Sequence, residues 1–345
     1  MRHVRKALAA VLLFAILVAY IIGLGFILAE NQPLFGESTR RIDYYGGWLS
    51  PKSGDFSRFD LNLLHEIPAS WQGKGSGKTR LLYLDYTVVH GHAYEPRDQQ
   101  NAPSCVGQAA AAAVDILAAS EINLLGHPER APPGRAAASV IYGLSRQEIG
   151  GLGPMAGGGS HCLWACQALQ QYGVVIHRNY GLIGYDLSYP SPLMCVKFGA
   201  KGVPSSLEDI AKLHPVFEFI RIDTYEELRD AVYSGCPVII GSDVGFGNKS
   251  GLTRDREGFL NPPRRRWYPS KWYHAMVVVG VCDKDRKGAL FLNSWGAHWI
   301  SGPKRFGTEP EGSFWADASI VEKMVSQGDS YAIRRFKGWP NYRLW

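Results

Sequence analysis

The chain has 345 residues, of which 46% are hydrophobic and 20% charged, and its formal net charge is +6 at pH 7. This composition excludes an intrinsically disordered chain and allows one large domain or two small ones. The modest positive charge does not by itself indicate nucleic-acid binding, and no nucleic-acid partner is expected.

The first segment predicts a membrane anchor. A basic tail, residues 1–6, precedes an uncharged run, residues 7–29, whose helix would be about 35 Å long and would cross a bilayer. This run is longer than the apolar part of a cleaved signal peptide, and its end, Ile27–Ala29, fits a cleavage site poorly. An uncleaved single-pass anchor is therefore favoured over a cleaved signal. Because the basic residues precede the span, we expect a cytoplasmic N-terminus and the rest of the chain outside.

Residues 30–79 are interpreted as a stalk or linker arm that leads to a folded domain over residues 80–345. Turn-forming glycine and proline recur in the arm, and the run Gln72–Thr79 is typical of a flexible linker. A phosphate-binding loop at this run is excluded, because the motif requires glycine where the chain has Gln72.

The remaining chain predicts an α+β class, with a mostly helical first half and a mostly β second half. The alanine-rich stretch Cys105–Ile122 predicts a long helix, and Gly150–Ser160 predicts a glycine-rich loop. Two further helices are expected at Cys162–Tyr172 and Tyr225–Ser234. Apolar, β-branched runs predict strands at Leu81–Val89, Pro237–Ile240, Ala275–Val281 and Ala289–Leu292.

Cys105 is a candidate nucleophile because of its place in the predicted helix. Pro103 prevents the helix from starting before Ser104, so the thiol lies at the helix N-terminus. There the unpaired backbone N–H groups and the helix dipole favour a thiolate. A cysteine at a helix start is also common as a plain structural residue, so this position alone does not establish a catalytic role.

His274 and Asn293 are predicted to meet across a hairpin. His274 stands at the start of one predicted strand, and Asn293 follows the end of the next. Antiparallel pairing would let the amide oxygen of Asn293 fix the tautomer of the imidazole and orient its other nitrogen toward a thiol. Trp295 is expected to shield that hydrogen bond from water.

These residues together resemble the papain family of cysteine peptidases. The resemblance rests on Gln99 six residues before Cys105, on His274-Ala275 and on the run Asn293-Ser294-Trp295-Gly296, and it spans about residues 80–335. It implies a two-lobed fold with a helical N-terminal lobe and an antiparallel β C-terminal lobe, here preceded by the membrane helix. The chain departs from the family pattern at Val106, where an aromatic residue is usual, and at Gln100, where glycine is common.

The resemblance also implies roles for individual residues. Cys105, His274 and Asn293 would form a catalytic triad, and Gln99 would donate its amide to the oxyanion together with the backbone N–H of Cys105. Gly157, Gly158 and Gly159 would bind the substrate backbone, although a flexible loop is an equal alternative for them. The implied reaction is hydrolysis of a peptide or protein substrate through a thioester, with no metal or other cofactor.

Two other functions stay open at this stage. One is a cell-wall amidase or endopeptidase that uses the same Cys-His chemistry. The other is a catalytically inactive, membrane-tethered binding or scaffold protein. The six cysteines include no C-x-x-C pair, which excludes a zinc ribbon or a thioredoxin-like motif.

Overall fold

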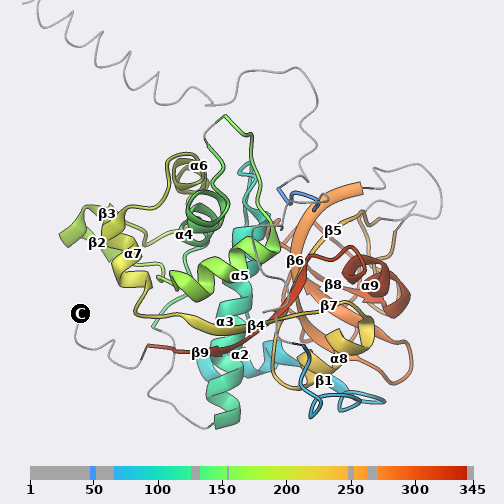
Figure 1. The fold of residues 1–345 in the computed structure, drawn as a ribbon. Coiled ribbons are helices and arrows are strands. Elements are labelled where there is room, and N and C mark those ends of the chain that lie inside the picture. Colours follow the sequence, from blue (N-terminus) through green and yellow to red (C-terminus); the bar gives the residue numbers. More distant parts are fainter. Residues whose placement is uncertain are drawn as a thin grey trace, which may run out of the picture. The chain divides into compact units, whose positions relative to one another are not determined.

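The helix α3, Cys105–Leu125, lies at the centre of the computed structural model (Figure 1). Its prediction from the alanine-rich run is confirmed. Small side chains let neighbours approach closely: a side-chain carbon on Gly107 would lie 2.6 Å from Cβ of Tyr142. Within the described part of the chain, α3 is the helix long and apolar enough to span a membrane, but 94% of its apolar window is buried inside the protein. It is therefore a core helix.

The structure describes residues 47–51, 66–125, 133–153, 155–247, 252–262 and 271–339. They all belong to the unit Asp43–Trp345. The predicted basic tail at 1–6 and membrane span at 7–29 lie outside the described residues.

Helices gather on one side of α3 (Figure 1). They are α4 (Ala138–Gly143), the π-helix η3 (Leu144–Ile149), α5 (Cys162–Gln171), α6 (Pro192–Lys201) and α7 (Ser205–Ala211). A short ribbon of β2 (Asn179–Tyr180) and β3 (Tyr185–Asp186), with the 3₁₀ turn η4 (Gly181–Ile183) between them, lies beside α7. The predicted helix at 162–172 is confirmed, and this half has its own small apolar core around Leu144, Trp164 and Phe198.

An antiparallel sheet forms the other half, in the order β4-β9-β5-β6-β7-β8, with β1 also paired to β6. Its strands are β1 (Thr79–Leu81), β4 (Val216–Arg221), β5 (Val238–Val244), β6 (Lys271–Cys282), β7 (Gly288–Leu292), β8 (Ser313–Asp317) and β9 (Ser330–Phe336). The helices α8 (Tyr225–Tyr233) and α9 (Ala318–Val325) pack against it. The α+β class is confirmed.

The hairpin of β6 and β7 is the part of the sheet that matters for function. Val277 pairs with Leu292, and a register irregularity between Val278 and Gly280 gives β6 an extra residue. On the other side, β5 pairs with β6 so that Ser242 stands opposite His274. This register places His274 and the residue after β7 at the same end of the hairpin.

The strand predicted at Leu81–Val89 is wrong beyond its first residue. Leu81 ends β1, and Leu82–His90 forms the helix α2, which ends at Gly91 with φ 74°. Helical spacing buries Leu82, Asp85 and Tyr86 together, and Asp85 accepts a hydrogen bond from Asn123 of α3 at 2.8 Å. The β-branched residues of this run therefore follow a helical period, set by packing on α3.

The flexible linker predicted at Gln72–Thr79 is also wrong. The backbone N–H groups of Gly73 and Gly75 donate to the carboxylate of Asp230 at 2.6 and 2.9 Å, and that of Gly77 donates to Asp283 at 2.8 Å. Two carboxylates far along the sequence thus hold these turns in place. The run is part of the same folded unit as residues 80–339, although the sequence analysis placed it in the stalk.

Candidate active site

Cys105 begins α3, as predicted from Pro103. The first backbone bond of the helix runs from the N–H of Gln108 to the carbonyl of Ser104 at 2.9 Å. The Cys105 side chain is completely buried. It lies beside the start of β6, because its sulfur accepts a hydrogen bond from the backbone N–H of Ala275, the residue after His274.

The thiol of Cys105 is in a protonated state at neutral pH in this conformation. Burial raises its pKa to about 12, and the backbone N–H groups of Ala275, Val106 and Cys105 itself offset this only in part. The N–H groups of Val106 and Cys105 at the helix start do lower the pKa, as expected, but the net shift in this conformation is upward. Desolvation outweighs the helix terminus because no water reaches the sulfur.

His274 and Asn293 meet as the predicted hairpin requires. Nε2 of His274 lies 2.7 Å from Oδ1 of Asn293, and both side chains are buried. The same oxygen accepts from the backbone N–H of Ser294 at 2.7 Å, which orients the amide with its oxygen toward the ring. Since this oxygen can only accept, Nε2 carries the proton, and Nδ1 is the unprotonated nitrogen of the neutral ring.

Trp295 packs on the histidine ring. The two ring centroids are 4.7 Å apart, and Trp272 and Trp299 lie 4.7 and 5.0 Å from Trp295. This group of aromatic side chains forms an apolar wall beside His274 and Asn293. Such surroundings would protect a hydrogen bond from competing water, and shielding by Trp295 stays a prediction.

Gln99 is fixed in place by the loop that carries Asn293. Its backbone N–H donates to the carbonyl of Ser294 at 2.8 Å, and its Oε1 accepts from the Ser294 hydroxyl at 2.7 Å. Its Nε2 donates to the carbonyl of Ala102 at 3.0 Å. Gln100 has φ 49°, a left-handed conformation that glycine adopts at less cost. A glycine at this position would relieve that strain.

The glycine-rich loop is ordered by a buried arginine. Arg146 of η3 donates from Nη1 to the carbonyl of Gly159 at 2.8 Å and from Nη2 to that of Gly157. Gly158 packs so tightly on Pro103 that a side-chain carbon would lie 2.2 Å from the proline ring. Residues 157–159 are thus held by contacts within the helical half, and their predicted binding of the substrate backbone stays a prediction. Of the three glycines, Gly159 comes nearest to the segment that lies over Cys105.

That segment is residues 47–51, which we name the strap. A side-chain carbon on Gly47 would lie 2.8 Å from the Cys105 sulfur. The N–H groups of Gly47 and Trp48 donate to the carbonyl of Tyr273 at 3.2 and 3.1 Å. On the opposite side, Leu49 donates to the carbonyl of Ser160 at 2.9 Å, and Ser160 donates to that of Gly47 at 3.0 Å. The strap therefore bridges the two halves directly over the thiol.

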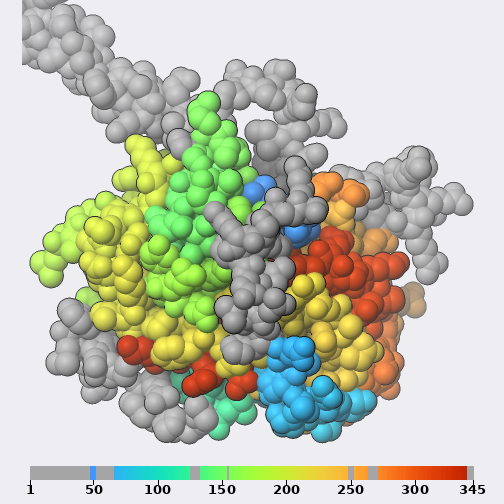
Figure 2. Space-filling model, in the orientation of Figure 1, coloured from blue at the N-terminus to red at the C-terminus, as the bar shows by residue number. Residues whose placement is uncertain are grey.

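The strap is visible in the figures as the dark blue segment. Figure 1 places it between the loop before α5 and the start of β6, and Figure 2 shows its atoms at the surface between the green helical half and the orange and red sheet half. The sequence analysis assigned these residues to the stalk. Nothing local in the sequence marks them, since each partner of the strap lies more than fifty residues away.

The side chain of Trp48 leaves the strap and enters the interior. It is 2% exposed, and its Nε1 donates to Oδ2 of Asp329 at 2.7 Å. A side-chain carbon on Gly241 of β5 would lie 2.0 Å from Nε1, so only glycine fits there. Asp329 also accepts from the backbone N–H groups of Cys162 and Leu163 at 2.9 Å each. We call the space bounded by Gly241, Asp329 and the start of α5 the indole site.

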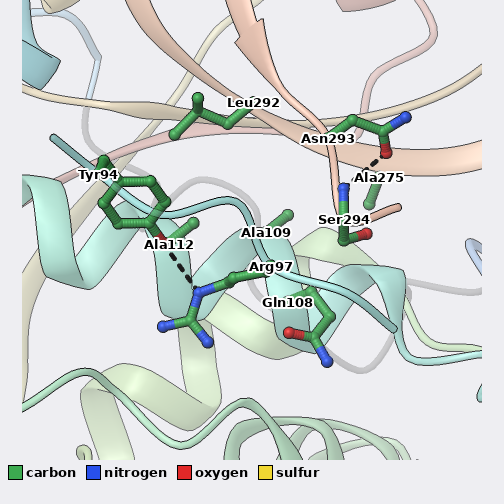
Figure 3. A pocket seen from close by; sticks show the side chains of 9 residues that line it. All are labelled: Tyr94, Arg97, Gln108, Ala109, Ala112, Ala275, Leu292, Asn293 and Ser294. Atoms are coloured by element: carbon green, nitrogen blue, oxygen red, sulfur yellow. Dashed lines mark hydrogen bonds between the residues drawn. The ribbon is translucent and has the colours of Figure 1, made fainter. Parts of the chain in front are cut away.

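A small cavity lies behind the site, between α3 and the end of β7 (Figure 3). Its lining residues are Tyr94, Arg97, Gln108, Ala109, Ala112, Ala275, Leu292, Asn293 and Ser294. Arg97 donates to the hydroxyl of Tyr94 at 2.9 Å and to Asp115 of α3 at 2.6 Å. The cavity therefore borders Asn293 and Ala275, the residue after His274.

Of the remaining cysteines, Cys162 reaches the indole site, because its thiol is hydrogen-bonded to Asp329. None of the six is in a disulfide. Within the described ranges, no three His, Cys, Asp or Glu side chains are grouped so as to hold a metal ion. The thiols of Cys162 and Cys166 are fully buried, and burial raises their pKa well above the ordinary value. They are therefore inert core residues in this conformation.

The helical half, the antiparallel sheet and the helix-tip cysteine beside the sheet define a papain-like fold, which confirms the expected two-lobed architecture. The solved structure of xylellain, a cysteine protease from Xylella fastidiosa, matches with a TM-score of 0.57 and 17% identity, covering 86% of this chain and 97% of that chain. The digestive procathepsin L 3 of Tenebrio molitor larval midgut matches with a TM-score of 0.51 and 14% identity, covering 85% and 77%. No family model and no curated protein matches the sequence.

Proposed function

We propose that this chain is a cysteine peptidase in which Cys105 is the nucleophile, His274 its base and Asn293 the residue that orients the base. The observation that carries the proposal is the hydrogen bond of 2.7 Å between Nε2 of His274 and Oδ1 of Asn293. It leaves Nδ1 as the basic nitrogen. The Cys105 sulfur accepts a hydrogen bond from the backbone N–H of Ala275, the residue after this histidine.

The reaction follows from these positions. His274 takes the thiol proton through Nδ1, and the sulfur attacks the peptide carbonyl carbon. The resulting oxyanion lies between the backbone N–H of Cys105 and the side-chain amide of Gln99, whose Nε2 has a second hydrogen besides the one given to Ala102. The imidazolium then protonates the leaving amine as the C–N bond breaks. Water attacks the thioester with His274 as base, which releases the carboxylic acid and restores the thiol.

The described conformation is a closed one. The strap lies over the sulfur of Cys105, and burial of the sulfur keeps the thiol protonated. A substrate must displace Gly47 to reach the sulfur, and the same displacement lets water and His274 approach the thiol. We infer that opening of the strap both clears the site and makes the nucleophile reactive.

The test is peptide hydrolysis by a chain with a weakened strap. Trp48→Ala removes the buried indole, and Cys105→Ala in that background should abolish hydrolysis while the fold survives. The matched control is Cys236→Ala, because Cys236 is also a buried thiol whose pKa burial raises to about 12, yet it lies two residues before β5 and its charged neighbours are Arg334, Glu121 and Glu218. Hydrolysis that persists without Cys105 would refute the proposal.

The two alternative functions are separated by the choice of substrate. A cell-wall amidase or endopeptidase would cleave peptidoglycan fragments in preference to protein substrates, again through Cys105. An inactive scaffold would cleave neither, and Cys105 would not react with an epoxide of the E-64 type in a manner that depends on His274.

The membrane anchor predicted at residues 7–29 stays part of the proposal. With a cytoplasmic N-terminus it would place the peptidase outside the cytoplasm. Cell fractionation tests the first point, because the full chain should resist extraction by carbonate. Digestion of intact cells or spheroplasts by an added protease tests the second: loss of the domain supports it, and complete protection contradicts the orientation.

A further inference from the structure

A short ribbon at the edge of the helical half carries a fully exposed leucine at its tip. The ribbon consists of β2 and β3 with the turn η4 between them (Figure 1), and Figure 2 shows it as a yellow-green projection. Tyr180 and Tyr185 pair across the ribbon, and both pack on the small apolar core of the helical half. The turn itself is different, because Leu182 is 105% exposed. Gly184 ends the turn with φ 80°, a conformation that favours glycine.

Two more large apolar side chains are exposed shortly after this tip. Tyr189, in the loop after β3, is 83% exposed, and Leu193, in the first turn of α6, is 67% exposed. The ribbon and α6 are in contact, because Nζ of Lys197 lies 5.8 Å from the centre of the Tyr185 ring. Single exposed apolar residues are ordinary on a protein surface, whereas a group of them marks a contact. We name the following residues the ribbon patch: Leu182, Tyr189, Leu193, Lys197 and Lys201.

The charge around these apolar residues is positive. Residues 178–201 contain one acidic residue, Asp186, and three basic ones: Arg178, Lys197 and Lys201. Leu193, Lys197 and Lys201 are exposed and follow one another at four-residue spacing, so they share one face of α6. Apolar side chains beside a basic helix face are the combination that binds the interface of a membrane containing anionic lipids.

The proposed anchor keeps such a membrane within reach of the patch. Residues 30–46 join the span predicted at 7–29 to the strap, and a fully extended chain of that length reaches about 60 Å at most. The strap is in turn held on the folded unit by its backbone bonds to Tyr273 and Ser160. A weak contact is therefore sufficient for docking, because the anchor makes the encounter with the bilayer intramolecular.

We propose that the ribbon patch docks on the anionic surface of the membrane that holds the anchor. Leu182 enters the boundary between headgroups and acyl chains, while the ammonium groups of Lys197 and Lys201 stay among the lipid phosphates. Docking then holds the helical half against the bilayer and gives the folded unit one orientation on it. This inference rests on the anchor and is independent of the roles assigned to Cys105 and His274.

The test places a fluorophore on the ribbon tip of the full chain. Leu182→Cys is labelled with nitrobenzoxadiazole, which is selective because the six native thiols are buried, and the chain is reconstituted in vesicles of phosphatidylcholine and phosphatidylglycerol. Nitroxide groups on the acyl chains quench a fluorophore that enters the bilayer. We expect quenching at residue 182 to be about threefold stronger, or more, than with the same label at Val88→Cys, an exposed position on α2.

Charge reversal tests the role of the basic face. Lys197→Glu combined with Lys201→Glu should lower the ratio of docked to undocked chain by about tenfold or more, and vesicles of pure phosphatidylcholine should lower it as well. The matched control is Lys74→Glu combined with Lys284→Glu, which makes the same change of charge at two exposed lysines outside the helical half. The control should leave the quenching as it was.

The outcomes separate the patch from the anchor. If the label at residue 182 is not quenched while the chain still floats with the vesicles in carbonate, the anchor holds and the docking is refuted. A chain that does not float refutes the anchor and this inference with it. A blue shift of the label that grows with the ratio of protein to lipid, without quenching by the lipid, would assign the patch to a second copy of the chain and would also contradict membrane docking.

Discussion

Removal of the Trp48 indole is expected to expose the nucleophile. Replacing a buried tryptophan by alanine costs about 3–5 kcal/mol. Because the indole is buried only while the strap is closed, this cost destabilises the closed conformation relative to the open one. The indole bond to Asp329 of 2.7 Å is lost at the same time, while the backbone bonds of the strap to Tyr273 and Ser160 remain. A change of this size lowers the ratio of closed to open chain by about 100-fold to several thousand-fold.

The consequence for Cys105 can be worked out from its pKa. With a pKa of about 12 in the closed chain, roughly one thiol in 10⁵ is ionised at pH 7. An uncovered cysteine with an ordinary pKa of about 8.5 is ionised to roughly 3%, before any help from His274. Opening of the strap therefore predicts an increase of about 100-fold or more in the rate of alkylation by iodoacetamide at pH 7.

The assay is mass-spectrometric measurement of Cys105 carbamidomethylation over time. Trp71→Ala is the matched control, because Trp71 is also a buried tryptophan of the N-terminal arm and packs near Arg334 instead of the site. It should leave the rate as in the unmodified chain. An unchanged rate in a Trp48→Ala chain that circular dichroism shows to be folded would refute the link between strap and thiol.

Three further predictions concern stability, each measured as the free energy of unfolding in urea. Gln100→Gly should stabilise the fold by about 0.5 kcal/mol. Relief of the left-handed conformation is worth about 1–2 kcal/mol, which exceeds the about 0.5–1 kcal/mol of conformational entropy that glycine adds to the unfolded chain. A lower free energy of unfolding in the glycine variant would show that the strain is absent. Asp115→Ala should destabilise by about 3–5 kcal/mol, because it leaves the buried guanidinium of Arg97 without its partner at 2.6 Å; a loss under 1 kcal/mol would contradict this. Asp329→Asn should become more stable relative to the unmodified chain as the pH rises from about 4 to 6, by up to about 3 kcal/mol. The reason is that folding raises the pKa of Asp329 from 3.8 to about 6, so the unmodified chain loses stability over this pH range. A stability difference that does not vary with pH would contradict this.

The local sequence pattern was enough to predict the parts of the site that depend on one helix or one hairpin. The helix from Cys105 follows from alanine content and from Pro103, and the meeting of His274 with Asn293 follows from two apolar strands separated by a short turn. Both are contacts within or between neighbours in the sequence. The failure at Leu82–His90 is of another kind, since a run of β-branched residues fits a strand and a helix equally until its packing partner, α3, is known.

The strap and the indole site lay beyond sequence reasoning for a physical reason. Trp48 and Asp329 are 281 positions apart, and neither stands in a motif. In the sequence, Gly241 is indistinguishable from an ordinary strand glycine, because its contact with the Trp48 indole exists only in the folded chain. The ordered state of the glycine-rich loop likewise depends on Arg146, whose guanidinium reaches the loop carbonyls only in the folded chain. Such long-range contacts have no local signature.

The pH dependence of Cys105 alkylation, measured in the Trp48→Ala chain with and without His274→Ala, tests the pairing of sulfur and imidazole most directly. If the two groups form an ion pair once the strap is open, the rate should rise with an apparent pKa at least one unit below the ordinary thiol value of about 8.5, and the histidine substitution should return it to about 8.5 or above. Identical pH profiles in the two chains would contradict the triad and with it the assignment of Cys105 as the nucleophile.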